Sequence, residues 1–310
     1  KGDLIYFGVA DEEAGAAWGA EWMFEHHPEA IDATYCLTEL GGWSHVDPHG
    51  HRHVTINVGE KGLAWRRLRV HGTPGHGSMP FGADNALVKA AEIVRRLAEH
   101  RPTPYLGDVW EAQVRSMGLP GELEAAMLSP DHVDDAIATL PVPVARSCHA
   151  LSHTTISPNI ADGGQKTNTI PDAVDIDVDI RTVPGTSRAD VEAMLAEALG
   201  DLAAHVDVTV LQHGDATLSP VRTELWDAVT RQTQVAYPGA NLVPGIVVGG
   251  TDARYYRDRG RVAYGTGLFS PGMDMATFGS RFHGHDERID VESLGLSTEF
   301  WIGIANDLLT

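Results

Sequence analysis

Hydrophobic and polar residues follow three patterns along this chain of 310 residues. Short, continuous apolar runs bounded by turn residues are typical of strands that are buried on both faces. Strict alternation of apolar and polar residues predicts a strand with one wet face. Apolar residues spaced three and four apart predict amphipathic helices. The distribution of these patterns therefore predicts which kind of sheet each part of the chain builds.

Continuous apolar runs near both ends of the chain predict buried strands. They are LIYFGVA (4–10), ATYCLTE (33–39), PGIVVGG (244–250) and RVAYG (261–265). Helical segments are expected at about 14–27 and at 291–309, where the chain closes. Buried strands that alternate with helices indicate an α/β fold with a mostly parallel sheet flanked by helices.

The middle of the chain predicts a second sheet with one wet face. Its strand-like segments include RRLRVHG (66–72), VDIDVDIR (174–181) and VDVTVL (206–211). HVTINV (53–58) is also strand-like and belongs to the part of the chain before residue 62. In VDIDVDIR the apolar residues face a core, while three aspartates and Arg181 face outward.

Helices are also expected in the middle of the chain. A helix over 84–100 should begin on a capping Asp84, with a buried stripe formed by Leu87, Ala91, Val94 and Leu97. Ser187 and Asp190 resemble a capping box before another helix, and 101–150 should be mostly helical, broken by prolines.

Charge and cysteine content narrow the classes of partner and compartment. The 43 acidic residues exceed the 23 basic ones, giving a formal net charge of −20, which argues against nucleic acid or an anionic membrane as partner. No apolar run approaches the roughly 18 residues needed to span a bilayer. Cys36 and Cys148 are expected to be reduced, which favours a cytoplasmic location. The 16 histidines make a metal worth considering.

Polar residues gather where the predicted strands end, which is where open α/β sheets place their sites. They are Glu12 and Glu13, Glu39, GGTDAR (249–254) and FHGHDERID (282–290). Carboxylates and a histidine form a donor set that zinc accepts. One of two adjacent glutamates could bind a cation while its neighbour acts as a base on water.

Each of these features also has a plain interpretation. Paired glutamates before a helix often only complement the helix dipole, and His283 alone favours a structural role. The histidine-rich HVDPHGHRH (45–53) is more typical of a polar loop than of a metal site. His149 and His153 lack the intervening glutamate of a zincin, G-x-S-x-G is absent, and no G-K-[ST] follows the glycine-rich HGTPGHGS (71–78).

The order of the motifs resembles one family, the co-catalytic zinc peptidases and deacylases that include acetylornithine deacetylase, succinyl-diaminopimelate desuccinylase, aminoacylase and carboxypeptidase G. ADEEAG is similar to the family's D-E-E turn, which implies Glu12 as general base and Glu13 as zinc ligand. TELGG follows 26 residues after Glu13 and implies Glu39 as ligand to the other zinc. FHGHDERI resembles the family's H-G-x-D-E-R pattern, which implies His283 as ligand rather than His285.

The resemblance also covers the middle of the chain. LRVHGTPGHGSMP looks like the start of the family's inserted lid and dimerisation domain, with His76 as its histidine. KTNTIPDAVDIDVDIRT resembles the lid strand that holds substrate through Asn168 and Arg181. GGTDAR resembles the loop that lines the substrate pocket, which implies substrate contacts from three of its residues: Gly250, Thr251 and Arg254.

The resemblance implies a domain organisation. A catalytic metallohydrolase domain is expected over 1–62 and 215–310, with an inserted α+β lid and dimerisation domain over 63–214. In the family, an H-x-D motif and a bridging aspartate precede the D-E-E turn by tens of residues, and no counterpart precedes Asp11 here. We therefore expect these residues alone, with three of five ligands, to be a fragment, a cleaved form or one piece of a split chain, and to hold zinc weakly.

The implied reaction is zinc-dependent hydrolysis of an amide or peptide bond in a small carboxylate-bearing substrate, such as an N-acyl amino acid or short peptide. Two zincs are expected per complete site, with cobalt or manganese as possible substitutes. The resemblance further implies a homodimer in which His76 serves the neighbouring subunit. A carbamoyl or ureido amidohydrolase, or a noncatalytic dimeric binding module, remain alternatives.

Overall fold

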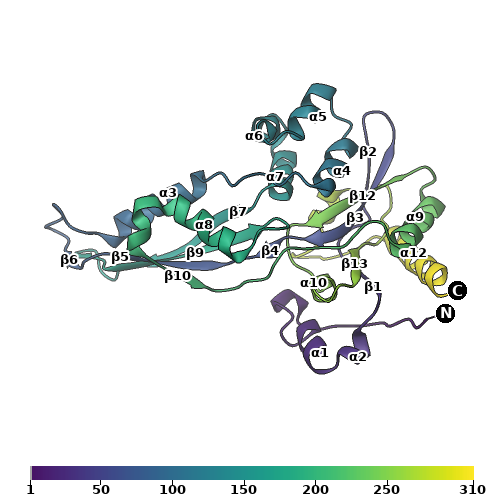
Figure 1. The fold of residues 1–310 in the computed structure, drawn as a ribbon, viewed down its shortest axis with the longest axis horizontal. Helices are drawn as coiled ribbons and strands as arrows, with labels where there is room; N and C mark the ends of the chain where they lie inside the picture. The colour runs from purple at the N-terminus through teal and green to yellow at the C-terminus, as the bar shows by residue number, and fades with distance from the viewer. Residues whose placement is uncertain (1) are drawn as a thin grey trace. The chain divides into compact units, whose positions relative to one another are not determined.

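The computed structural model describes residues 2–310, apart from the side chains of residues 275 and 276, and its ribbon is drawn in Figure 1. The chain divides into two compact units. Unit 1 comprises Lys1–Glu60, Leu106–Leu140 and Thr217–Thr310, and unit 2 comprises Lys61–Tyr105 and Pro141–Ala216.

Unit 1 contains a mixed six-stranded sheet. Its strands are β1 (Tyr35–Thr38), β2 (Ser44–Val46), β3 (Arg52–Glu60), β11 (Thr217–Leu218), β12 (Asn241–Val247) and β13 (Val262–Gly265). β1 pairs with β13, and β12 with β3, in parallel, whereas β2, β11 and β13 pair with β3 antiparallel. The apolar side chains of β3 (Val54, Ile56 and Val58) are fully buried, as expected for the strand with the most neighbours.

Two helices of unit 1 begin after side chains that cap them. α9 begins after Thr223 and α12 after Asp290; their side chains accept hydrogen bonds from the amides of Trp226 and Ser293, three residues ahead. The unit's helices are η1 (Glu12–Ala14), α1 (Ala20–His26), α2 (Pro28–Ile31), α4 (Asp108–Ser116), α5 (Gly121–Met127), α6 (Val133–Ala138), α9 (Glu224–Ala236), α10 (Ala253–Arg257), α11 (Met275–Gly279) and α12 (Val291–Leu309).

Unit 2 contains an antiparallel five-stranded sheet and a separate two-stranded ribbon. The sheet is made of β4 (Gly62–Leu63), β5 (Arg66–His71), β7 (Thr155–Gly163), β9 (Ala173–Thr182) and β10 (Val206–Val210). The ribbon pairs β6 (Gly75–His76) with β8 (Thr169–Ile170). The helical elements are α3 (Ala86–Glu99), α7 (Val142–Ser152), α8 (Arg188–Leu199) and η2 (Gly200–His205).

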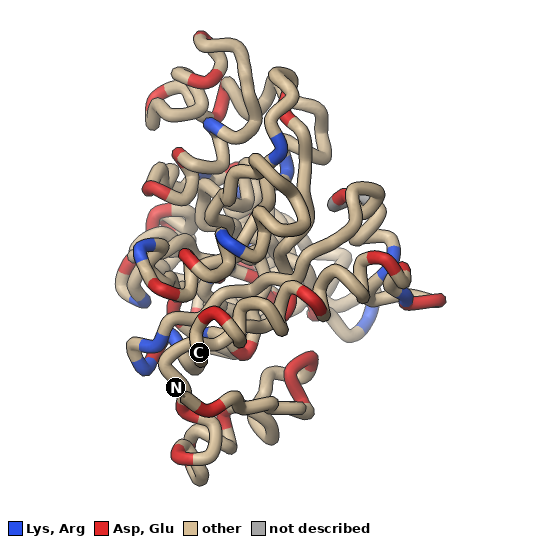
Figure 2. Tube along the Cα trace, turned by 90° about the vertical axis from the view of Figure 1, so that its right-hand side faces the viewer, with Lys and Arg blue, Asp and Glu red and all other residues tan. Residues whose placement is uncertain are grey.

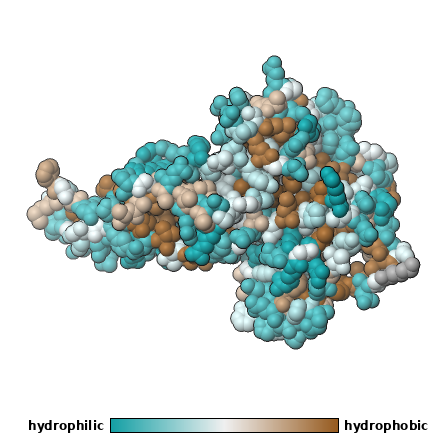
Figure 3. All heavy atoms as spheres, in the orientation of Figure 1, coloured by the Kyte–Doolittle hydropathy of each residue, from teal (hydrophilic) through white to brown (hydrophobic). Residues whose placement is uncertain are grey.

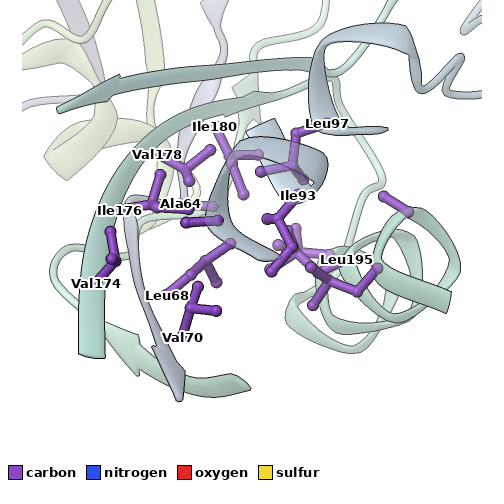
Figure 4. Packing of buried hydrophobic residues seen from close by; sticks show 14 of the residues in the cluster. Ala64, Leu68, Val70, Ile93, Leu97, Val174, Ile176, Val178, Ile180 and Leu195 are labelled. Carbon is purple, nitrogen blue, oxygen red and sulfur yellow. The ribbon is translucent and has the colours of Figure 1, made fainter. Parts of the chain in front are cut away.

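The core of unit 2 forms between the dry face of its sheet and two helices, as Figure 4 shows. Alternate residues of β9 (Val174, Ile176, Val178 and Ile180) are buried there, together with Ile93 and Leu97 of α3 and Leu195 of α8. The acidic residues between them lie on the other face, so the predicted wet face is confirmed. The capping box of Ser187 and Asp190 before α8 is also confirmed.

Three local predictions need correction. Residues 4–10 form no strand, and Leu4 and Tyr6 are largely exposed, because no described strand pairs with this segment. α3 is capped by Asn85, since Asp84 instead contacts Lys89. Its buried stripe is therefore shifted by one residue in most places, to Ala86, Ala90, Ile93 and Leu97. The sheet of unit 1 also contains antiparallel pairs, since β2 returns to β3 through a short hairpin.

Residues 106–140, which lie within the predicted lid range of 63–214, belong to unit 1 in the structure. Gln113 of α4 donates a hydrogen bond to the carbonyl of Pro244 on β12, 2.7 Å away. The catalytic role expected of 1–62 and 215–310, and the lid role expected of 63–214, stay predictions.

The surface is acidic, and charged residues are spread along the trace in Figure 2. Apolar residues also reach the surface, in several patches on the face drawn in Figure 3. Among the described residues, no helix combines the length and the apolar character needed to cross a bilayer. Cys36 and Cys148 are both unbridged, as expected.

Candidate active site

The acidic turn of unit 1 is a single tight turn that carries two adjacent glutamates. Asp11 and Gly15 both have positive φ (69° and 104°), and Glu12–Ala14 form one turn of 3-10 helix between them. The side chain of Asp11 accepts a hydrogen bond from the amide of Trp18 at 2.9 Å. Because neighbouring residues of so tight a turn point in different directions, Glu12 and Glu13 can meet different partners.

Residues of the GGTDAR motif hold this turn in place. The Arg254 guanidinium and the Tyr255 hydroxyl donate hydrogen bonds to the carbonyl of Gly15, at 3.3 and 3.4 Å. Arg254 also donates to the Tyr255 hydroxyl at 2.9 Å. Hydrogen bonds therefore join two segments that lie more than two hundred residues apart in sequence.

Four carboxylates of unit 1 lie close enough for their charges to repel one another. Burial, followed by the charges of Glu39, Asp252 and Glu13, raises the pKa of Glu12 to about 7. Burial and the charge of Glu39 raise the pKa of Asp252 to about 6. The charge of Arg254 opposes both shifts without cancelling them. Such a group of acids favours a cation or a shared proton.

Asp252 is the site residue that sequence reasoning missed. Its side chain is buried, and neither carboxylate oxygen has a hydrogen-bond partner among the described residues. An unpaired buried carboxylate is costly unless a cation or a proton compensates it. The signal was available, because Asp252 lies inside the GGTDAR motif, between Thr251 and Arg254, both of which were predicted to contact substrate.

A buried ion pair holds the loop that carries Asp252. Glu60, at the end of β3, accepts hydrogen bonds from the amide and hydroxyl of Thr251, at 3.1 and 2.7 Å. It also pairs with Arg257 at 3.2 Å, and both side chains are almost fully buried. Gly250 precedes this contact, and a side-chain carbon on it would lie 3.3 Å from the Arg254 guanidinium.

Glu39 follows β1 and is placed by the turn after it. Leu40 has positive φ (61°), and Gly41 adopts φ 144°. A side-chain carbon on Gly41 would lie 2.2 Å from the carbonyl oxygen of Gly265, so only glycine fits there. The Thr38 hydroxyl donates a hydrogen bond to Glu39. This close approach to Gly265 explains why the TELGG motif has glycine at position 41.

His283 is brought to Glu13 from the far end of the sequence. Its Nε2 lies 3.8 Å from Glu13 Oε1, and both side chains are more than half exposed. The His283 backbone has positive φ (55°), and its amide donates to the Glu287 carboxylate. Phe282 packs beside the imidazole with ring centroids 4.8 Å apart.

The carboxylate and imidazole groups present are suitable ligands for a divalent cation, but they do not form a complete metal site. Two atoms that both bind zinc at about 2.0–2.1 Å can be at most about 4.2 Å apart, so the contact between Glu13 and His283 is compatible with one shared ion. The uncompensated charges of Glu12, Glu39 and Asp252 also favour a cation. No group of three His, Cys, Asp or Glu side chains in the described part of the chain is arranged to hold a metal.

The candidate residues of unit 2 lie on two different sheets. His76 is exposed on the β6–β8 ribbon, where its Nδ1 lies 2.7 Å from the Ser78 hydroxyl. The carbonyl of Asn168 accepts a hydrogen bond from the amide of Gly77 at 2.8 Å, so His76 and Asn168 are neighbours. Arg181 lies on β9, where it pairs with Asp179.

The histidine-rich segment is a hydrogen-bonded hairpin. Asp47 accepts hydrogen bonds from the amides of His49 and His51, and lies 3.2 Å from the rings of His51 and His53. These bonds hold the pKa of Asp47 far below its usual range. His49, His51 and His53 therefore have a structural role in this hairpin, as hydrogen-bond partners of Asp47. His149 and His153 stack on each other, with ring centroids 4.5 Å apart.

Comparison with known proteins supports the family resemblance. Residues 58–207 match the peptidase dimerisation domain of the M20 type. The chain is 26% identical over 310 residues to the N-fatty-acyl-amino acid synthase/hydrolase PM20D1 of Xenopus tropicalis, covering 96% of this chain and 59% of that protein. It is 23% identical over 251 residues to a probable carboxypeptidase S-like 2 of Dictyostelium discoideum, covering 80% of this chain and 47% of that protein.

A solved structure supports the fold. The M20 family metallo-carboxypeptidase Sso-CP2 from Sulfolobus solfataricus aligns with a TM-score of 0.65 at 15% identity, covering 96% of this chain and 69% of that one. The chain thus has an α/β fold, and residues 58–207 match a peptidase dimerisation domain. The resemblance to M20 peptidases and deacylases that the motifs predicted is thus supported by the matched dimerisation domain and by these relatives. It spans about half the length of the two relatives.

Proposed function

We propose that the complete protein is a zinc-dependent hydrolase of an amide or peptide bond. By the complete protein we mean the whole encoded polypeptide. Its substrate is a small carboxylate-bearing molecule, an N-acyl amino acid or a short peptide. The observation that carries the proposal is the convergence of Glu13 and His283 at 3.8 Å beside the glutamate that precedes Glu13. The name of the frog relative, an N-fatty-acyl-amino acid synthase/hydrolase, supports this substrate class.

The proposed roles follow from the geometry of the acidic turn. Glu13, Glu39 and His283 hold metal, and Glu12 accepts a proton from the attacking water. A pKa near 7 suits this task, because a base works best near the operating pH. Zinc, when bound, supplies a Lewis acid and lowers the pKa of water. Glu12 then returns the proton to the leaving amine.

Substrate contacts are proposed for two sets of residues. Gly250, Thr251 and Arg254 belong to the loop that Glu60 and Arg257 hold in place. In unit 2, Asn168 and Arg181 are proposed to bind substrate, with Arg181 pairing its carboxylate. A guanidinium binds a carboxylate through two parallel hydrogen bonds, which an ammonium cannot reproduce.

We further propose that the protein is a homodimer joined through its dimerisation domain, with His76 stabilising the oxyanion in the partner's site. The match to the dimerisation domain supports the dimer. The exposure of His76 supports a role outside the core of its own unit. A cytoplasmic location stays a prediction from the two unbridged cysteines.

The test is a substrate comparison with the complete protein. Metal is removed by dialysis against a chelator, zinc is restored, and hydrolysis of an N-acyl amino acid, a dipeptide and an N-carbamoyl amino acid is measured. We expect zinc-dependent cleavage of one of the first two at a rate at least about tenfold above the third. Preference for the N-carbamoyl compound would favour the carbamoyl amidohydrolase, and a folded dimer inert toward all three would favour the noncatalytic module.

A further inference from the structure

Arg181 is fixed at its backbone by two neighbouring strands. On β9 it pairs with Leu63 of β4 on one side and with Thr155 of β7 on the other. A residue on a strand that is paired on both sides has little backbone freedom, so its side-chain contacts decide where the guanidinium points.

Asp179, two residues earlier on the same face, binds one edge of this guanidinium. Arg181 Nε donates to Asp179 Oδ1 at 2.7 Å, and Arg181 Nη2 donates to Asp179 Oδ2 at 3.2 Å. No hydrogen bond described for this residue uses its Nη1. A guanidinium has five N–H donors in a fixed plane, so the edge formed by Nη1 and Nη2 can still bind a second carboxylate.

Trp65, in the short link between β4 and β5, holds the same carboxylate. Its indole Nε1 donates to Asp179 Oδ1 at 2.7 Å. The Arg181 guanidinium carbon also lies 5.5 Å from the centre of the Trp65 ring, within the range of a cation–π contact. Asp179 and Arg181 are therefore both restrained by one aromatic side chain, which is about one third exposed.

A buried lysine lies close enough to repel Arg181. The Lys61 ammonium donates to the carbonyls of Ala150 and His153, at 2.9 and 2.7 Å, and lies 3.4 Å from the Thr155 hydroxyl. Burial and then the charge of Arg181 lower the pKa of Lys61 to about 7, while Asp179 raises it. Asp179 thus offsets repulsion between two cations, one of which is fixed by three acceptors.

We propose that Asp179 and Trp65 are positioning residues that hold the Arg181 guanidinium with its Nη1–Nη2 edge free for the carboxylate of the substrate. This inference rests on the proposed function, since it takes Arg181 as the carboxylate-binding residue. The pair of Asp179 and Arg181 is then part of substrate recognition rather than only a surface ion pair.

Removal of the Asp179 charge has two opposite consequences. It frees the guanidinium from a competing carboxylate, which would strengthen substrate binding. It also removes the anion that binds Arg181 and that opposes the effect of its charge on Lys61, so the flexible side chain turns toward water and loses its orientation. The second effect is larger, because bidentate binding requires a fixed plane and the Lys61 ammonium cannot move away.

The experiment measures KM and kcat of the complete protein with a carboxylate substrate and with its carboxamide analogue. For Asp179→Asn we expect KM for the carboxylate to rise about tenfold, with kcat within about twofold and the carboxamide unaffected. For Trp65→Phe, which keeps the ring and removes the donor, we expect a rise of about threefold. The matched control is Asp177→Asn, which removes the same charge from the same face of β9, where Arg67 is its partner. This control should leave KM unchanged.

Three results would overturn the inference. They are a KM that falls or stays the same in Asp179→Asn, equal losses for carboxylate and carboxamide, and an equal effect of Asp177→Asn. Arg181→Lys separates this inference from the proposed function. If Arg181→Lys changes neither substrate, the proposed carboxylate contact is wrong. If it raises KM for the carboxylate while both Asp179→Asn and Trp65→Phe do not, only the positioning role is wrong.

Discussion

Each unit carries a group of carboxylates, and the two groups differ in how their charges are compensated. On the wet face of β9 in unit 2, each aspartate has an arginine: Asp175 pairs with Arg69, Asp177 with Arg67 and Asp179 with Arg181. In unit 1 the pKa values of Glu12 and Asp252 are raised, first by burial and then by neighbouring acids, and the one nearby arginine does not cancel these shifts.

The difference distinguishes acids that form surface ion pairs from acids that lack a compensating cation. A cross-strand ion pair needs nothing further, and it keeps a wet sheet face soluble. Uncompensated acids at the end of a sheet store repulsion that a cation or a proton relieves, which is why perturbed carboxylates mark candidate sites. Asp179 is an intermediate case. It forms an ion pair with Arg181, but the Nη1–Nη2 edge of that guanidinium can still bind a second carboxylate.

The largest expected effect separates the two glutamates of the acidic turn. Glu12→Gln keeps the shape of the side chain and removes the base, so kcat of the complete protein should fall by about 10²–10⁴-fold while zinc stays bound. Glu13→Ala removes a proposed ligand, so zinc affinity should fall first. Metal analysis after dialysis, alongside steady-state kinetics, measures both.

Comparing the two variants tests which glutamate is the base and which is the metal ligand. If Glu12→Gln released the metal and Glu13→Ala retained it, the roles of the two residues would be exchanged. If neither variant changed metal content or rate, the acids of unit 1 would be surface charges like those of β9.

His76 tests whether unit 2 is only a scaffold. His76→Ala should lower kcat by about 10²–10³-fold with zinc content unchanged, the cost of one oxyanion donor. Mixing His76→Ala with Glu12→Gln and letting subunits exchange should restore activity toward about a quarter of wild type. That fraction follows because half of the dimers are mixed and each regains one of two sites.

The exchange must itself be demonstrated, for example with differently tagged subunits. Recovery would place His76 in the neighbouring subunit's site. No recovery despite proven exchange would mean that His76 acts within its own chain or has no catalytic role.

The fold could be predicted from sequence wherever a local pattern decides the outcome. Alternation in β9, the capping box before α8 and the bounds of α12 depend on residues within a few positions of one another, and all three are confirmed. The apolar run 4–10 is different, because a strand requires a neighbour and none of the described strands pairs with it. The cap of α3 moved by one residue, since Asp84 and Asn85 are both good caps and Lys89 contacts Asp84.

The candidate site was predicted through motifs, and the residues outside them were missed. Glu60 and Arg257 show no pattern that predicts a buried ion pair, because their contact joins segments nearly two hundred residues apart. Trp65 likewise reaches Asp179 only because β5 and β9 are neighbours in the sheet. Asp252 lies within a motif, but its burial and lack of a partner depend on the packed structure.

A smaller effect is expected from Asp252, in stability rather than rate. Its pKa rises from 3.8 to about 6 on folding, so the metal-free protein should be most stable below about pH 4 with respect to this group and lose stability as the pH rises through 6. Asp252→Asn should stabilise the metal-free protein at pH 8 by on the order of 1–2 kcal/mol and have little effect at pH 4. Denaturant unfolding at both pH values measures this. Equal effects at both would mean that Asp252 is compensated.

The smallest effect should come from the paired acids, and here the pH dependence is reversed. Hydrogen bonding to Arg67 lowers the pKa of Asp177, so the stability from this pair is present above the ordinary aspartate pKa of 3.8 and is lost as the pH falls through the lower folded value. Because the pair is partly exposed, Asp177→Asn should shift the melting temperature at pH 7 by no more than about 2 °C. Thermal unfolding at pH 7 and pH 3 is the measurement, and the difference between variant and parent should shrink at pH 3. A large destabilisation at pH 7, or one that grows on acidification, would show that the β9 acids are not simple ion pairs, and the contrast between the two units would fail.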